Sequence, residues 1–164
     1  MEIYRYRLLG FKESKMKRHD RAIILNDLAN SYAMEMRYTK AIERYKEALS
    51  LYIYLAREKP VQYGIHIAHV FSNMSIIYLN LNKVKESEYL HQNALKMHRV
   101  LTKHNPNRYG IELAQCLVDG VLYLKQHSFT LYEAEMAVNS INVSCDKDYL
   151  VNAIRKLHAH TSAL

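Results

Sequence analysis

The chain has 164 residues, a length that fits one domain or one short array of repeats. Gly (4) and Pro (2) are scarce, which disfavours turn-rich sheets and Gly-rich phosphate loops and favours long helices with short connections. The formal net charge of +7 permits an acidic partner or nucleic acid without specifying either, and no apolar stretch reaches the roughly 18 residues that a membrane span needs.

Apolar residues at helical spacing predict the elements of the chain. Segment 2–11 carries charges where a secretion signal would be apolar, so we expect a short helix there and no signal peptide. Pro60 and Pro106 lie just after expected helices, where a helix cannot continue. The expected helices cover residues 2–11, 20–36, 38–57, 62–80, 83–103, 108–126, 129–143 and 147–160.

An offset of 46 residues relates many positions of the chain, which indicates an internal repeat. The segments 59–68 and 105–114 share Pro, Tyr, Gly, Ile and Ala at this offset. Each repeat is expected to be a pair of helices, because its second half carries apolar residues four and three positions apart on one helix face. Further columns at this offset are Ala22, Ala68 and Ala114; Leu25, Phe71 and Leu117; and Asp27, Asn73 and Asp119.

The first two repeats resemble the tetratricopeptide repeat family, whose signature combines small and large residues at fixed places in two helices. The small residues let the two helices approach closely, and the large ones fill the space between layers. The second repeat has one polar substitution, His91. The matching residues are Leu28, Ala29, Tyr32, Ala41, Tyr45 and Ala48 in the first repeat, and Met74, Ser75, Tyr78, Ser87, His91 and Ala94 in the second.

The third repeat departs from the signature. Its residues match only if the register slips by one position, and Ala134 then fits poorly, so the signature gives weak support to a second helix there. The residues that match after the slip are Leu117, Gly120, Tyr123 and Phe129.

The resemblance implies an all-α, right-handed superhelical solenoid of α-hairpins, similar to long-repeat bacterial members and the kinesin light chain type. It implies one domain, 1–164, with about three helix pairs between an N-terminal half-repeat and a C-terminal capping helix. The expected parts are the half-repeat helix and basic link in 1–19, repeat 1 in 20–59, repeat 2 in 60–105, the degenerate repeat 3 in 106–146, and the capping helix and tail in 147–164.

The resemblance also implies a concave groove lined by the first helix of each pair. Polar side chains there hydrogen-bond the backbone of an extended peptide, and an amide suits this because it donates and accepts at once. A solvated or intra-repeat polar contact is the alternative role. The expected groove residues are Asn26, Asp27, Asn30, His69, Ser72, Asn73 and Asp119, with Leu117 and Val121 adding selectivity.

A dense run of basic residues lies in the expected link between the first two helices. Its simplest interpretation is a solvated linker, and the alternative is a patch for nucleic acid or an acidic partner. The run consists of Lys12, Lys15, Lys17, Arg18 and Arg21.

No combination of residues predicts a metal site, a cofactor or catalysis. His66 and His69 are spaced for two ligands of one metal, but no third ligand is near, and His66 is expected to be exposed. The sequence lacks G-x-S-x-G and H-E-x-x-H motifs. Cys116, expected on a helix–helix face, and Cys145 lack the spacing of a redox or metal motif, which is typical of reduced thiols in the cytoplasm.

Both ends of the chain align with parts of a repeat. Residues 2–11 match the end of a second helix, so they are expected to cap the array or to mark a piece of a longer protein. Alternatively, this half-repeat docks onto a second copy and forms a homodimer. Tyr149, Leu150 and Ile154 have helical spacing in the expected capping helix.

These features predict a cytoplasmic, bacterial scaffold or adaptor that binds a peptide or a partner protein and is not an enzyme. The alternatives are a basic helical protein that binds nucleic acid and a peptide-sensing regulatory domain. Neither a cofactor nor a membrane is expected to take part.

Overall fold

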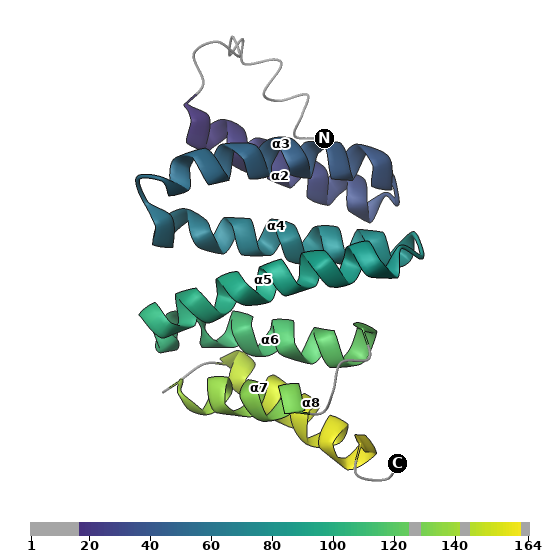
Figure 1. Ribbon diagram of the computed structural model, residues 1–164, viewed down its shortest axis with the longest axis vertical. Helices are drawn as coiled ribbons and strands as arrows, with labels where there is room; N and C mark the ends of the chain where they lie inside the picture. Colours follow the sequence, from purple (N-terminus) through teal and green to yellow (C-terminus); the bar gives the residue numbers. More distant parts are fainter. Residues whose placement is uncertain (1–16, 125–128, 142–144, 162–164) are drawn as a thin grey trace. The chain divides into compact units, whose positions relative to one another are not determined.

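A computed structural model describes residues 17–124, 129–141 and 145–161 (Figure 1). Every regular element among these residues is an α-helix, which confirms the predicted all-α class. The chain divides into two compact units, residues 1–70 and 71–164. The helices are α2 (Arg18–Met34), α3 (Tyr38–Ala56), α4 (Pro60–Asn80), α5 (Val84–His104), α6 (Pro106–Leu124), α7 (Phe129–Asn139) and α8 (Cys145–Thr161).

The predicted helix ranges agree with these bounds to within a few residues. The largest difference is at the end of the predicted helix 129–143, because α7 ends at Asn139. The predicted helix 2–11, and the homodimer contact suggested for it, lie outside the described residues. No described helix combines the length and the apolar character that crossing a bilayer requires.

The two prolines begin helices. α4 starts at Pro60 and α6 at Pro106, and the preceding helices end at Ala56 and His104, as the sequence predicted. Proline suits the first helical position because its φ is already helical and its missing N–H would have no partner within the helix.

The turns that end α2 and α4 have the same geometry at the offset of 46 residues. Met36 and Asn82 both have a φ of 58°. In the next position, the N–H of Arg37 donates to the Tyr32 carbonyl at 2.8 Å. The N–H of Lys83 likewise donates to the carbonyl of Tyr78 at 2.8 Å. Both helix ends therefore use a left-handed residue to satisfy carbonyls of the last turn.

In the first unit, α2 and α3 form an antiparallel pair joined by this turn (Figure 1). Small side chains lie where the two helices meet, since Ala29 and Ala41 are completely buried. Large rings from α3 complete the core, among them the buried Tyr45 and Tyr52. This arrangement follows the division of small and large residues in the repeat signature.

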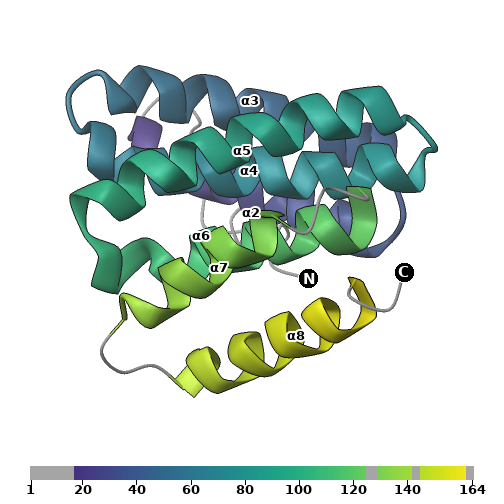
Figure 2. The ribbon, with the colours of Figure 1, turned by 60° about the horizontal axis from the view of Figure 1, so that its bottom comes forward.

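In the second unit, α7 packs against α6, and α8 lies beside α7 (Figure 2). Ala134 is fully buried in this core, on the second helix α7 that the repeat signature supported only weakly. A Cβ atom on Gly110 of α6 would lie 3.0 Å from the carbonyl oxygen of Ala137, which shows how closely α6 and α7 approach. The degenerate third repeat thus forms a helix pair with a glycine at its close approach.

The last helix, α8, covers this core with Leu150 and Ile154, both buried. Tyr149 is 72% exposed, so it does not share the packed face that the sequence suggested for it. The reason is its position, since neighbouring residues on a helix point about 100° apart and Leu150 already faces the core.

Met36 offers a test of the turn geometry. A non-glycine residue in the left-handed region is strained, and Asn tolerates this region better than Met. We expect Met36→Asn, which copies Asn82, to raise the free energy of unfolding by about 0.5–1 kcal/mol in urea denaturation. The reverse change, Asn82→Met, should lower it, and a loss of stability in Met36→Asn would contradict the role assigned to the turn.

Candidate functional site

The predicted groove residues lie on the first helix of each pair, α2, α4 and α6. Of the polar ones, Asp27 and His69 are exposed and the others are half-buried. Leu117 is completely buried, so its prediction as a groove residue was wrong. Val121 packs partly buried against the same core cluster. Both side chains serve helix packing in the second unit.

Asn30 has an intra-repeat contact. The hydroxyl of Tyr45 on α3 donates a hydrogen bond to its side-chain oxygen Oδ1. For Asn30 the structure therefore shows the intra-repeat contact that the sequence left open as an alternative. The Tyr45 ring is buried, and this bond gives its hydroxyl a partner within the helix pair.

The position of Tyr45 is taken by His91 in the next repeat, and the position of Asn30 by Ile76. Imidazole is shorter than phenol and has no hydroxyl, and isoleucine has no acceptor. The polar bond that closes the first pair is thus missing from the equivalent place in the second pair.

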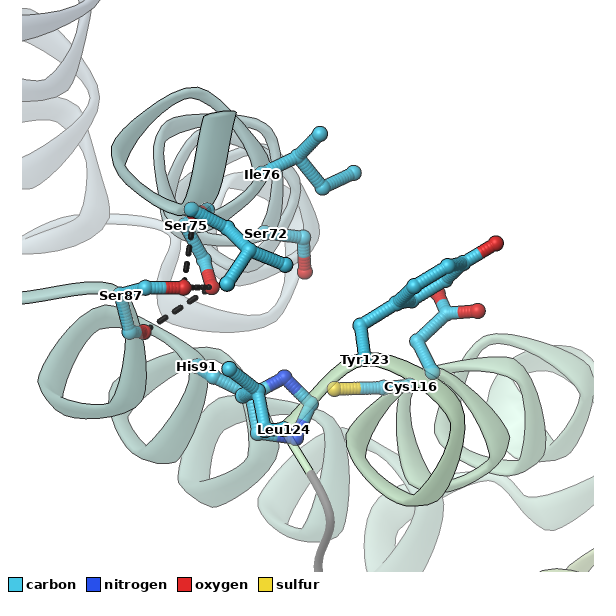
Figure 3. A pocket seen from close by; sticks show the side chains of 10 residues that line it. Ser72, Ser75, Ile76, Ser87, His91, Cys116, Tyr123 and Leu124 are labelled. Atoms are coloured by element: carbon cyan, nitrogen blue, oxygen red, sulfur yellow. Dashed lines mark hydrogen bonds between the residues drawn. The ribbon is translucent and has the colours of Figure 1, made fainter. Parts of the chain in front are cut away.

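A small cavity lies at this place, between α4, α5 and α6 in the second unit (Figure 3). Its volume is about 30 Å³. Figure 3 shows the His91 ring and the sulfur of Cys116 at one side of the cavity, and Tyr123 and Ile76 at the other. The lining residues are Ser72, Ser75, Ile76, Leu79, Ser87, His91, Cys116, Asp119, Tyr123 and Leu124.

Two serines fix the distance between α4 and α5 beside this cavity. Ser75 Oγ donates to the Ser87 carbonyl at 2.9 Å, and Ser87 Oγ donates to the Ser75 carbonyl at 2.8 Å. They take the positions of Ala29 and Ala41 in the first pair. Because each hydroxyl bonds the opposite backbone, a polar residue replaces alanine without leaving a buried group unsatisfied.

His91 is a buried polar residue at the cavity. Only 4% of it is exposed, and its Nε2 atom has no hydrogen-bond partner among the described residues. Burial lowers the pKa of His91 from its ordinary value, so the ring is neutral at physiological pH. A neutral imidazole has one nitrogen that accepts a hydrogen bond. The side chain can therefore accept a hydrogen bond from a donor placed in the cavity.

Cys116 is a free, buried thiol. Burial, followed by the nearby charge of Asp119, raises its pKa to about 12, and a hydrogen bond with Ser72 offsets this only in part. A thiol with such a pKa carries almost no thiolate at neutral pH and is a poor nucleophile. This agrees with the predicted core role of Cys116, whereas the side chain of Cys145 lies outside the described residues.

Asp119 is the acidic group of the cavity. Burial raises its pKa, and a hydrogen bond from Gln115 Nε2 to Oδ1, 2.8 Å long, opposes the shift. None of the ion pairs found within the described part of the chain includes Asp119. Among the described residues, this half-buried carboxylate is therefore held by a neutral donor and not by an ion pair.

The first unit contains an aromatic and histidine cluster that the sequence did not reveal. The His66 ring stacks on Tyr52 with centroids 4.9 Å apart and an angle of 11°. His66 is half-buried, so the prediction that it is exposed was wrong. Tyr63 and His19 complete the cluster, with their ring centroids 5.7 Å apart. Burial raises the pKa of Tyr52 to about 12, with a smaller contribution from the charge of Asp27.

The predicted basic patch is only partly described. Lys12 and Lys15 lie outside the described residues, and Lys17 is exposed just before α2. Arg18 and Arg21 belong to α2, so the prediction that the whole run lies in a link was wrong. The guanidinium of Arg18 lies over the Tyr54 ring, 4.7 Å from its centroid.

Within the described ranges, no group of three His, Cys, Asp or Glu residues could hold a metal ion. The chain matches no protein-family model and no curated protein.

The two histidines with lowered pKa make stability depend on pH. Burial lowers the pKa of His91, and burial with the charges of His69 and His19 lowers that of His66. Below the ordinary value of 6.5, the unfolded chain therefore binds more protons than the folded one. We expect the free energy of unfolding to be lower at about pH 5.5 than at about pH 7.5 in urea denaturation.

His91→Phe and His66→Phe should each reduce this loss, because they keep a ring and remove the titration. The matched control is His104→Gln, which changes an exposed histidine and should leave the loss as it is. Asp119 has the opposite effect on stability, because burial raises its pKa from the ordinary value of 3.8 and its protonation at low pH therefore favours the folded chain. All variants keep Asp119, so this effect is the same in each of them. If the free energy of unfolding falls as much at lower pH in His91→Phe as in the unmodified chain, His91 does not cause this pH dependence.

Proposed function

We propose that the chain is a protein-interaction module of the tetratricopeptide type, without enzymatic activity of its own. In this proposal the helix pairs stack as a right-handed superhelix in a cytoplasmic scaffold or adaptor. The first helices of the pairs, α2, α4 and α6, line the surface that binds a peptide or a partner protein.

The observation that carries the proposal is the polar column Asp27, Asn73 and Asp119. Its members lie at the same position of three helices, 46 residues apart. Asp27 is exposed, and the other two are half-buried. Buried neighbours such as Ala22 and Ala114 form the packing face of the same helices. A recurring polar position beside an apolar one suits a surface that contacts a ligand.

The chemistry of the column suits an extended peptide. A peptide backbone presents N–H donors and C=O acceptors in alternation, and carboxylates accept while the Asn73 amide both donates and accepts. The equivalent geometry of the turns at Met36 and Asn82 supports regular repeats, which would present such groups at regular intervals.

The buried Cys116 thiol supports a binding function over a catalytic one. Burial raises the pKa of this thiol to about 12, so it carries almost no thiolate at neutral pH and does not suit covalent catalysis. Asp119 accepts a hydrogen bond from the side chain of Gln115, which orients its carboxylate.

Peptide selection tests the proposal directly. Peptides selected from a random displayed library on the immobilised chain would be synthesised, and their dissociation constants measured by fluorescence polarisation. We expect Asp27→Ala and Asn73→Ala each to weaken binding about three- to tenfold, which corresponds to the loss of one net hydrogen bond.

The matched control is Gln92→Ala, an exposed change on the second helix α5, which should bind as the unmodified chain does. Circular dichroism would show that all variants stay helical. Asn30→Ala is not suitable for this test, because it removes the acceptor of Tyr45. Unchanged affinity in both Asp27→Ala and Asn73→Ala would refute the groove.

A further inference from the structure

We propose that the cavity between α4, α5 and α6 is a specificity pocket for the ammonium group of a lysine side chain in the partner protein. This inference rests on the proposed binding function and adds the chemistry of one contact to it. Four features of the cavity carry it: an acceptor without a donor, its size, its charge and its walls (Figure 3).

The acceptor is the side chain of His91. In the first repeat the equivalent Tyr45 has Asn30 as its partner, whereas Ile76 replaces that partner here. The buried Nε2 of His91 is left without a hydrogen bond within the described residues. Leaving a buried polar atom unsatisfied is unfavourable, so a ligand that donates to it regains part of this cost.

The size of the cavity limits its ligand to a single small head group. Its volume of about 30 Å³ exceeds the roughly 10–15 Å³ that a single water molecule needs, so the cavity has room for a small head group such as an ammonium group. Sites for drug-sized ligands and cofactors measure roughly 300–1,000 Å³, which excludes them here. The planar guanidinium of arginine is also larger than an ammonium group.

The charge of the cavity selects a cation. Asp119 is its carboxylate, and of the described lining residues none is Lys or Arg. Arg99 contributes little repulsion, because it forms two hydrogen bonds to the Glu133 carboxylate, of 2.7 and 2.6 Å. An ammonium group has three donors and no acceptor, so it suits a cavity lined by a carboxylate and a neutral imidazole. An anionic ligand would instead meet the carboxylate of Asp119.

The walls suit the methylene stem of a lysine. Ile76 is 50% exposed and lies with Leu79 on α4, so both offer apolar contact to four methylene groups. Tyr123 is 59% exposed, and Figure 3 shows its ring at the side of the cavity opposite His91. A phenol ring attracts a cation that approaches its face.

The probe for this pocket is Nα-acetyl-lysine methylamide, titrated into the full chain and followed by the imidazole ¹⁵N resonances of His91. We expect a saturable shift of Nε2 at millimolar concentrations. The norleucine analogue, which has the same stem without nitrogen, should produce none. Because the probe is a single amino acid, the result does not depend on the peptide groove.

Two variants test the residues. Asp119→Asn should weaken the affinity for the lysine probe at least tenfold. Glu135→Gln, a charge change at an exposed position of α7, should leave this affinity unchanged. The double variant His91→Tyr with Ile76→Asn copies Tyr45 and Asn30. It should fill the cavity and abolish binding of the lysine probe, which is followed in this variant by the resonances of Tyr123. It should also unfold at a urea concentration no lower than the unmodified chain does.

Several outcomes would overturn the inference. They are equal binding of the norleucine analogue, an unchanged affinity in Asp119→Asn, and undiminished binding in the double variant. Putrescine that binds more tightly than the lysine probe would assign the pocket to a free amine and overturn the lysine assignment. Loss of the lysine shift together with intact peptide selection would reject this pocket alone. Failed peptide selection with an intact shift would reject the groove alone.

Discussion

The close approach of two helices at small residues is the constraint on which the helix pairs depend. In α2 and α3 the contact is made by Ala29 and Ala41, which carry no atom beyond Cβ. Helix axes meeting through such residues lie near the lower end of the usual distance of about 8–10 Å. In α4 and α5 the serines 75 and 87 keep the approach, because each hydroxyl bonds the opposite carbonyl.

The space beside this contact must then be filled by the residue four positions after the small one on the second helix. Tyr45 fills it in the first pair, and its hydroxyl is satisfied by Asn30. His91 has the same position in the second pair, with Ile76 opposite it, and a cavity remains. The two pairs therefore differ at this place in two residues, with His91 where the first pair has Tyr45 and Ile76 where it has Asn30.

The all-α class and the helix bounds were predictable, because the helix pairs repeat their packing residues at a constant offset. The site was less predictable. The offset alone does not tell which residues touch across a pair, so only the three-dimensional structure reveals the Tyr45–Asn30 bond and the His91 Nε2 atom without a partner among the described residues. Leu117 was misplaced for the same reason, since a residue one or two positions from a polar column can face the core. The stacking of His66 on Tyr52 joins different helices, and sequence spacing within one helix carries no signal for it.

The polar groups of the second unit differ in whether they pair with an opposite charge, and this difference distinguishes groups with a structural role from candidate ligand-binding groups. Arg99 and Glu133 are half-buried charges joined to each other by two hydrogen bonds, so their contact needs no ligand to explain it. Asp119 and His91 lie at one cavity, and among the described residues the first has a neutral donor and the second lacks a partner for Nε2. Both arrangements cost desolvation, and the contact of Arg99 with Glu133 regains it through opposite charges. The acid and the acceptor at the cavity therefore suit a cationic donor.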